Sequence, residues 1–271
     1  MKPKVIFFGN GKLAEVVLAK LQESCEIIFH ARVKEDLEEV KRLKREVPEA
    51  HGVLASYGVM IREDVLGLFE PEGILNVHPS LLPKYRGASP IESAILNGDS
   101  EFSVSVMKLV RAMDAGPIYF ALTVKDIEVE KIDKWWIYEE LGMRGADWIG
   151  WKLGECAKAG VKWISDLVEA KEQEGEATFT TKLDKGMSRL TPEVDGAEKC
   201  WRKVMAFAGF PKTKYDFLGR ECIILGAKVG EARESELDIL CADGKYLVVT
   251  ELQPAGKRGM DVKSFLNGYK K

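Results

Sequence analysis

Near the N-terminus the sequence reads Lys4-Val5-Ile6-Phe7-Phe8-Gly9-Asn10-Gly11. The apolar run predicts a buried strand, and the glycines predict a tight turn directly after it. Residues 12–23 follow with apolar side chains at helical spacing, so the chain begins as strand, turn and helix. This order is typical of a domain in which helices cover a mainly parallel sheet.

The same alternation continues through the first two thirds of the chain. We expect further strands and helices in these segments: strands at 25–29, 51–56, 73–77, 102–109 and 117–124, and helices at 34–46, 89–96 and within 131–171. Strands that alternate with helices predict βαβ units. The predicted fold class is therefore α/β, with a doubly wound, mainly parallel sheet.

The remainder of the chain predicts a second, smaller domain. A helix is expected near 195–208, followed by short strands at 221–225, 237–242 and 246–252. Short strands in a segment of this size favour a β-barrel, here of OB-like type. We expect a first domain at 1–176, a linker at 177–192 and the OB-like domain at 193–271.

Composition limits the classes of function. The chain has 271 residues, of which 46% are hydrophobic and 31% are charged, and its net charge is −3. These values are ordinary for a globular protein and argue against a general DNA- or RNA-binding protein, although residues 177–271 are mildly basic. No apolar run reaches the length of about 18 residues that a membrane helix needs. Residues 5–8 are too short for a signal-peptide core.

The five cysteines are scattered and form no CxxC pair or Cys/His cluster. We therefore expect neither a zinc site nor a disulfide framework, and we predict a protein of the reducing cytoplasm. The pattern Gly9-x-Gly11-x-x-Ala14 matches a dinucleotide-binding turn, but the second strand ends at Ala31-Arg32 without the acidic residue that such sites use. We interpret these glycines as the turn that any doubly wound fold requires.

Asn76 and His78 are the most informative polar residues. They lie two positions apart at the carboxyl end of a predicted strand, so their side chains share a face at the edge where α/β sheets bind ligands. An amide and an imidazole can both donate hydrogen bonds to an oxygen that becomes negative during a reaction. Asp114 lies in a loop before Gly116-Pro117. It either caps its own turn or orients His78, and the spacing leaves both possibilities open.

Five of the six tryptophans lie between Trp135 and Trp163. They could form a stacking platform for bases, or they could pack against the sheet. We favour packing, because apolar residues from 141 to 156 recur at the spacing of a buried helical face.

Three features together resemble the folate-dependent formyltransferase superfamily. They are the Asn76-x-His78 pair, the loop Ser80-Leu81-Leu82-Pro83 and the later Asp114. The resemblance implies that Asn76, His78 and Asp114 are the catalytic residues. It also implies that the folate co-substrate contacts two segments, listed in full as Ser80, Leu81, Leu82 and Pro83 in the loop and Tyr57, Gly58 and Val59 beside the pterin pocket.

Two other segments narrow the resemblance. Residues 85–91 resemble superfamily members that formylate methionyl-tRNA or an amino sugar, and residues 251–268 are similar to the closing segment of the methionyl-tRNA formyltransferases. The resemblance implies transfer of the formyl group of 10-formyltetrahydrofolate to the α-amine of methionyl initiator tRNA, for translation initiation, without a metal. The alternatives are a sugar-amine N-formyltransferase, a formyltetrahydrofolate hydrolase and, more remotely, a non-enzymatic RNA-binding protein.

Two departures from that family concern tRNA. The family usually carries a longer basic loop after the second strand, whereas here only residues 30–34 separate strand from helix and Arg32 is the one arginine there. The family's linker usually continues into Ile-Asp-Trp, where this chain has Leu190-Thr191-Pro192. We expect tRNA contacts from Arg32 and from the densest basic stretch, which consists of Lys182, Lys185, Arg189, Lys199, Arg202 and Lys203.

Overall fold

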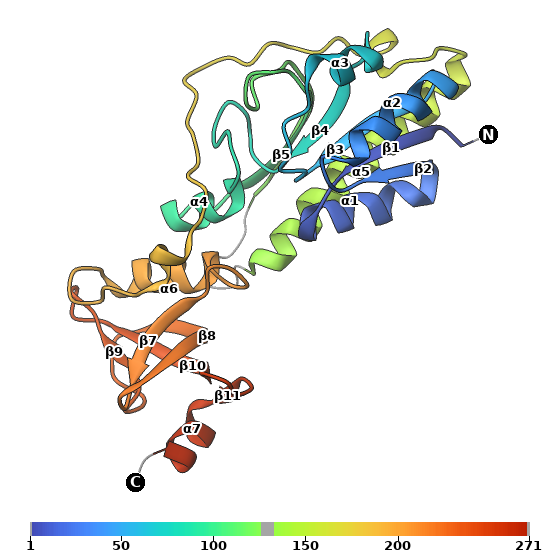
Figure 1. Cartoon of the computed structure of the whole chain (residues 1–271). Helices are drawn as coiled ribbons and strands as arrows, with labels where there is room; N and C mark the ends of the chain where they lie inside the picture. Colours follow the sequence, from blue (N-terminus) through green and yellow to red (C-terminus); the bar gives the residue numbers. More distant parts are fainter. Residues whose placement is uncertain (1, 126–132, 270–271) are drawn as a thin grey trace. The chain divides into compact units, whose positions relative to one another are not determined.

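The computed structural model describes residues 2–125 and 133–269 (Figure 1). These residues form two compact units. The first contains 2–91, 101–125 and 135–181, and the second contains 92–100, 133–134 and 182–269. The chain thus passes into the second unit within the stretch 177–192, and a short piece of the first half joins the second unit. In the described part of the chain, no helix is both long and apolar enough to cross a membrane.

A six-stranded sheet forms the centre of the first unit, in the order β2-β1-β3-β4-β5-β6. Its strands are β1 Lys4–Gly9, β2 Glu26–Ala31, β3 His51–Ala55, β4 Ile74–His78, β5 Phe102–Lys108 and β6 Ile118–Val124. The first four strands in this order run parallel, whereas β5 pairs antiparallel with β4 and with β6. The predicted α/β class with a mainly parallel sheet is confirmed. The antiparallel pairing of β5 with β4 and β6 was not predicted.

Helices cover both faces of this sheet. They are α1 Gly11–Ser24, α2 Asp36–Glu46, α3 Glu63–Leu66 and α5 Lys134–Ala159, with 3₁₀ turns at Gly67–Phe69 and Ile164–Asp166. Helix α4 Pro90–Asn97 begins in the first unit, and its residues from 92 onward belong to the second. On one face, Ile6 and Phe8 pack in a buried cluster with Val40 of α2 and Val65 of α3. On the other, α5 approaches α1 so closely that a Cβ added at Gly142 would lie 2.9 Å from a methyl of Val16. This arrangement is the doubly wound fold.

The first turn needs its glycines for steric reasons. A Cβ added at Gly9 would lie 2.2 Å from the carbonyl oxygen of Ala55. Gly11 has a φ of +79°, which side chains other than glycine rarely adopt. The Asn10 side chain donates a hydrogen bond to the carbonyl of Arg32, which ties the turn to the end of β2. These contacts explain the glycine pattern without a dinucleotide.

The tryptophans of α5 and its surroundings divide into two groups. Trp148 stacks on Phe120 with ring centroids 5.2 Å apart, and Trp163 meets the His51 ring edge-on at the same distance. These two pack against the domain as predicted. The side chains at positions 135, 136 and 151 remain exposed, so the packing interpretation holds for only part of the cluster.

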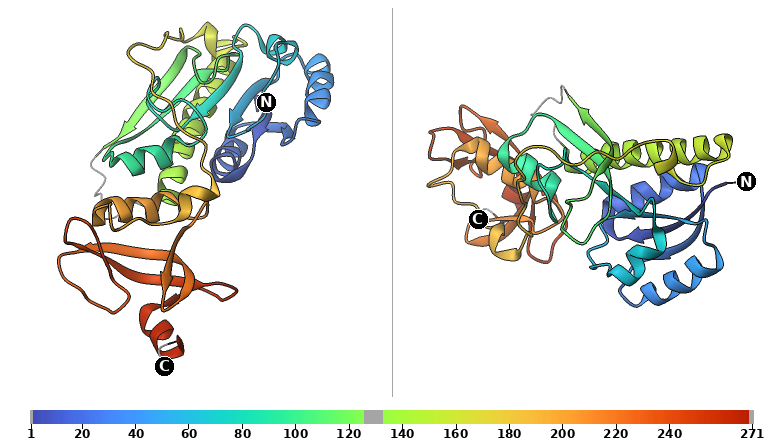
Figure 2. Two further views of the ribbon diagram at one scale, coloured as in Figure 1. Left: turned by 60° about the vertical axis from the view of Figure 1, so that its left-hand side comes forward. Right: turned by 90° about the horizontal axis from the view of Figure 1, so that it is seen from above.

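The second unit is built on a five-stranded antiparallel sheet that curls on itself, as Figure 2 shows. Its strands are β7 Thr213–Phe217, β8 Arg220–Gly230, β9 Ile239–Leu240, β10 Tyr246–Pro254 and β11 Met260–Asp261, and its helices are α6 Ala197–Ala206 and α7 Val262–Tyr269, with a 3₁₀ turn at Lys185–Ser188. Helix α6 packs on β8 and β10, and buries Trp201 and Val204. The predicted β-rich second domain is confirmed, and β7 and α7 are elements that the periodicity did not predict.

Candidate active site

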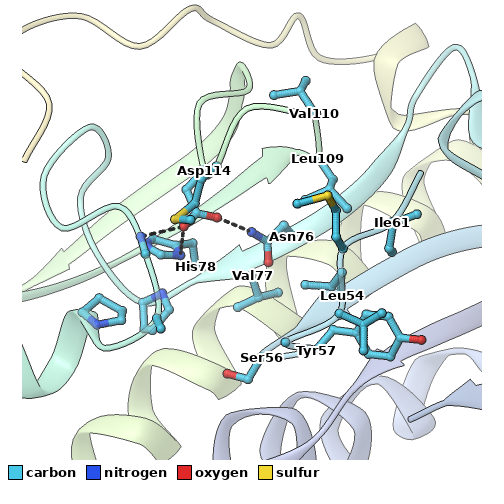
Figure 3. Close-up of a pocket in the computed structure, with 18 of the residues that line it drawn as sticks. Leu54, Ser56, Tyr57, Ile61, Asn76, Val77, His78, Leu109, Val110 and Asp114 are labelled. Carbon is cyan, nitrogen blue, oxygen red and sulfur yellow. Dashed lines mark hydrogen bonds and ion pairs between the residues drawn. The ribbon is translucent and has the colours of Figure 1, made fainter. Parts of the chain in front are cut away.

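Asn76 and His78 form the last part of β4, the strand that ends at the junction between the parallel strands and the antiparallel edge. Each of these residues is only 5% exposed. Asp114 reaches them from the loop between β5 and β6 (Figure 3). The Asn76 amide donates to Asp114 Oδ1 at 3.3 Å, and His78 Nδ1 lies 3.6 Å from Asp114 Oδ2. The structure therefore brings the three predicted catalytic side chains together.

Neighbouring backbone groups fix the orientation of the imidazole and the carboxylate. His78 Nε2 donates to the carbonyl of Tyr85 at 3.0 Å, and the backbone N–H of Gly87 donates to Asp114 Oδ2 at 2.8 Å. Both ring nitrogens of His78 thus face oxygen acceptors, which the imidazolium form can satisfy with its two N–H groups. Gly87 has a φ of +116° and would clash with Thr180 if it carried a Cβ, so this donor position requires glycine.

A pocket of about 480 Å³ opens beside these residues. This volume lies in the range of small-molecule sites, about 300–1,000 Å³. One wall is largely apolar, and Figure 3 shows Leu54, Tyr57, Ile61 and Leu109 in it. Val59 also lines the pocket. Burial raises the pKa of Tyr57 to about 12, and its hydroxyl donates to the Val33 carbonyl at 2.7 Å, so it remains a neutral phenol. The pocket can hold a flat, mostly apolar ring against the polar triad.

The two segments predicted to contact folate occupy different positions. Tyr57, Gly58 and Val59 line the pocket, whereas the lining from the other segment stops at Pro79 and does not include Ser80, Leu81, Leu82 or Pro83. Ser80 and Leu82 are buried, and both bond to Ser105: its hydroxyl donates to the Ser80 carbonyl at 2.7 Å and accepts from Leu82 N–H at 3.2 Å. These residues shape the loop next to the site, and their predicted contact with folate stays a prediction.

Several pocket residues were not predicted from the sequence. Val110 and Met113 flank Asp114, and Gly87 supplies the N–H that holds the carboxylate. In the sequence, their only sign of a role is that they lie next to the quoted motifs. That the loops carrying them meet is visible only in the fold. The described residues contain no group of three or more His, Cys, Asp or Glu side chains that could hold a metal ion.

The residues predicted to contact tRNA are mostly engaged within the protein. Arg189 pairs with Asp216 at 2.8 Å and Lys199 with Asp195 at 2.6 Å, while Arg202 pairs with Glu198. Lys203 donates to the Arg189 carbonyl, and burial lowers its pKa.

The side chains of Arg189 and Lys199 stay exposed despite their ion pairs. Arg32, Lys182 and Lys185 are exposed as well. Arg32 donates through Nε to His30 Nδ1 at 3.3 Å. The ammonium groups of Lys182 and Lys185 form no ion pair with the parts of the chain described here.

The amide and the imidazole can donate hydrogen bonds to an oxygen that becomes negative, and the carboxylate can accept a proton. These groups at one end of an apolar pocket suit an enzyme that transfers an acyl group between two substrates. Two family models agree with this class: one for the formyl transferase domain matches residues 5–135, and one for the formyl transferase C-terminal domain matches residues 183–270. The chain belongs to the methionyl-tRNA formyltransferase family and is a formyl transferase.

Relatives of known name support this assignment over nearly the whole chain. The methionyl-tRNA formyltransferase of Dictyoglomus thermophilum is 31% identical over 98% of this chain and 97% of its own, and that of Carboxydothermus hydrogenoformans is 33% identical over 97% and 85%. Among solved structures, the Clostridium thermocellum methionyl-tRNA formyltransferase has a TM-score of 0.61 at 18% identity, covering 94% of this chain and 99% of that one.

A second structure with the same fold carries a folate. HypX from Aquifex aeolicus in complex with tetrahydrofolic acid has a TM-score of 0.71 at 18% identity, and covers 99% of this chain but only 47% of that protein. This chain therefore corresponds to about half of HypX. The formyl transferase family uses formyl-tetrahydrofolate, and its fold is confirmed for this chain.

Proposed function

We propose that this enzyme transfers the formyl group of 10-formyltetrahydrofolate to the α-amine of methionyl initiator tRNA. The observation that carries the proposal is the convergence of Asn76, His78 and Asp114 beside the pocket. The names of the relatives, which match over both units of the chain, support the choice of acceptor. We place the reaction in the cytoplasm, where initiator tRNA is used, and with no membrane or DNA partner.

Asn76 and His78 act on the oxygen of the formyl group. Attack by the amine turns the formyl carbon tetrahedral and gives its oxygen a negative charge. One N–H of the Asn76 amide is bonded to Asp114, which leaves its second N–H for this oxygen. Nε2 of His78 donates to the Tyr85 carbonyl, so Nδ1 can donate only when the ring is an imidazolium. In that form the 3.6 Å gap between Nδ1 and Asp114, too long for a good hydrogen bond, leaves the Nδ1 N–H for the same oxygen. Each such donor stabilises the transition state by about 3–4 kcal/mol.

Asp114 accepts the proton that the attacking amine must lose. The attacking amine must be neutral, and it becomes positively charged when its nitrogen bonds to the formyl carbon. The Asp114 carboxylate, directly or through His78 or a water molecule, takes a proton from this nitrogen. The folate nitrogen receives a proton as its bond to the formyl carbon breaks. The new C–N bond thus replaces the old one, and no net proton is gained or lost.

The apolar wall fits the folate co-substrate. Leu54, Val59, Ile61 and Leu109 would hold the flat pterin ring, and the backbone at Tyr57 and Gly58 would meet its polar edge. The loop containing Ser80–Pro83 would flank the co-substrate where the chain leaves Pro79. This assignment fits the size of the pocket and the chemistry of its lining.

Two other activities are alternatives to this one: formylation of an amino sugar and hydrolysis of the formyl group. The N-formyltransferase of Helicobacter canadensis, solved with folinic acid and dTDP-3-aminofucose, has a TM-score of 0.65 at 13% identity, a likeness that shows only a shared fold. A hydrolase would use water instead of an amine. The names of the relatives that match along nearly the whole chain favour tRNA over both.

Separate incubations with each acceptor test the proposal. The purified protein receives 10-formyltetrahydrofolate together with methionyl initiator tRNA, with an amino-sugar nucleotide, or with no amine. We expect formylated methionine in the first reaction and folate turnover at background level in the other two. Turnover without an amine would support a hydrolase, and formylation of only the sugar would support the sugar enzyme.

A further inference from the structure

The segment that follows α5 is more than a connector between the units. After the turn at Ile164–Asp166 it runs along the first unit as a strap of residues 171–180 (Figure 1). Lys171 pairs with Ile118 at the start of β6 through two backbone hydrogen bonds of 2.7 and 2.9 Å. Further along, Thr178 and Thr180 pair with both sides of Arg86 at 2.8 and 2.7 Å. The strap therefore lies across the two loops that carry the site.

Gln173 is the residue of the strap that reaches the catalytic loop. Its Nε2 group donates to the carbonyls of Asp114 and Gly116, both at 2.8 Å. Its Oε1 accepts from Nε and Nη2 of Arg86 at 3.1 and 2.6 Å. A glutamine amide has two N–H donors and an oxygen with two lone pairs. All four are used here, so the side chain has one orientation and links the Asp114 loop to the loop after β4.

Asp114 needs such support because its backbone is strained. Its φ is +46°, a conformation that residues other than glycine rarely adopt and that persists only where the surroundings impose it. Gly87 and Asn76 hold the carboxylate from one side. Gln173 holds the carbonyl of the same residue from the other side.

The strap also supports the residue that orients His78. Thr178 Oγ1 accepts from the backbone N–H of Tyr85 at 2.8 Å, and the carbonyl of Tyr85 accepts from His78 Nε2. Tyr85 itself has a φ of +61°. The strap thus braces the neighbours of both His78 and Asp114.

We propose that Gln173 is a positioning residue for the reaction: it holds Asp114 in the orientation needed for proton transfer without touching either substrate. This inference rests on the function proposed above for Asp114. Misplacement of a reacting group by about 1 Å can slow a reaction about a hundredfold, so loss of the two donors on Gln173 should appear in turnover.

Two substitutions at Gln173 test the inference in the full-length enzyme. Gln173→Leu removes every polar contact at similar size. Gln173→Glu keeps an acceptor for Arg86 but loses both donors to the Asp114 loop, and it retains a polar side chain if the leucine variant fails to fold. The control is Glu174→Ala, at the exposed neighbouring position. We expect both Gln173 variants to lower kcat about 10- to 100-fold with KM for the folate changed less than about threefold, and the control to match wild type.

A double-substitution cycle separates positioning from a general structural role. Because Gln173 acts through Asp114, adding Gln173→Leu or Gln173→Glu to Asp114→Asn should reduce kcat by less than about threefold beyond Asp114→Asn alone. Fully multiplicative losses, or wild-type kcat in the Gln173 variants beside an impaired Asp114→Asn, would overturn the inference and leave the proposed function standing. Wild-type turnover in Asp114→Asn would instead overturn the proposed role of Asp114 and the inference with it.

Discussion

Asn76 illustrates how one side chain serves both structure and chemistry. It lies at the end of β4 and is almost fully buried, yet it lines the pocket, and its amide donates to Asp114. In His78, two residues later, Nε2 donates to the Tyr85 carbonyl and Nδ1 lies 3.6 Å from Asp114. In the proposed reaction these donors are held in place before the substrates bind, so they would stabilise the transition state without reorganisation during the reaction.

Removal of either donor should therefore slow turnover and leave folate binding almost unchanged. We expect Asn76→Ala and His78→Ala to lower kcat by about a hundredfold or more, with the Kd for the folate within about threefold of wild type. A suitable control is Ser103→Ala on β5, a buried polar residue whose hydroxyl bonds to Thr123. Wild-type kcat in either site variant would contradict the assigned roles.

The sequence predicts some of these residues and misses others for a physical reason. Asn76 and His78 are recognisable because they share one strand face, a relation fixed by local geometry. Asp114 lies in a loop whose direction depends on the antiparallel pairing of β5 and β6, so its role remained open. Gln173 makes its contacts through a strap that has no regular periodicity, and the sequence gives no signal for them.

At the scale of elements, α2 carries an unusual buried cation. Lys44 is 4% exposed, donates to the Pro48 carbonyl at 2.6 Å and lies 5.0 Å from the ring centres of Phe69 and Trp163. Burial lowers its pKa to about 8. Between this value and the ordinary value near 10.5, the unfolded chain binds more protons than the folded one at this position.

This difference predicts a pH dependence of stability. Because the unfolded state binds more protons in this window, the contribution of Lys44 to the free energy of unfolding rises with pH from about 8 to 10.5. In denaturant titrations, the unfolding free energy of wild type minus that of Lys44→Met should increase as the pH is raised from 8 to 10. The exposed substitution Lys228→Met should show no such trend relative to wild type. A constant difference between wild type and Lys44→Met would contradict the buried position of this charge.

The short connection between β2 and α2 is a second element with a functional consequence. Asp36 Oδ2 accepts from the backbone N–H groups of Arg32 and Val33 at 2.6 and 3.0 Å, which closes the loop tightly. Arg32 is exposed there, so it is available for a nucleic acid. Few contacts at this point leave little basis for rejecting the wrong tRNA, because specificity is a difference of affinities.

Discrimination between initiator and elongator methionyl-tRNA should therefore be weaker than in an enzyme with a long basic loop, by about 1–2 kcal/mol. Arg32→Ala should reduce it further. The measurement is the ratio of kcat/KM values on the two tRNAs, taken beside a long-loop relative. Equal ratios in the two enzymes, unaffected by Arg32→Ala, would show that another segment has taken over this role.

At the scale of the whole molecule, the two units were predictable to different degrees. The first follows from strands such as β1, whose continuous apolar run Val5–Phe8 allows only a buried position. In the second unit, β7 escaped prediction because Thr213–Phe217 mixes charged and aromatic residues, and its pairing with β8 depends on the fold. The basic stretch was visible in the sequence, but the pairing of Arg189, Lys199 and Arg202 with acidic neighbours was not.

This pairing changes which basic residues should bind tRNA. Lys182 and Lys185 are exposed, so we expect them to contact phosphates, and each phosphate contact releases counterions. Lys182→Glu with Lys185→Glu should flatten the dependence of log Kd for tRNA on log salt by about 1–2 units. The matched control reverses Lys228 and Lys245, which pair with Glu234 and Glu231. An equal effect of both pairs would place the tRNA site elsewhere.

The proposed reaction is tested most directly by a single-turnover assay of formyl transfer from 10-formyltetrahydrofolate to methionyl initiator tRNA. Wild type and Asp114→Asn are compared at saturating folate, and formylmethionine is quantified after hydrolysis of the tRNA ester. We expect one equivalent of formylmethionine from wild type, and a rate at least about a hundredfold lower from Asp114→Asn. Absence of formylmethionine in the wild-type reaction would rule out the proposed transfer, and equal rates for the two proteins would rule out the proposed role of Asp114.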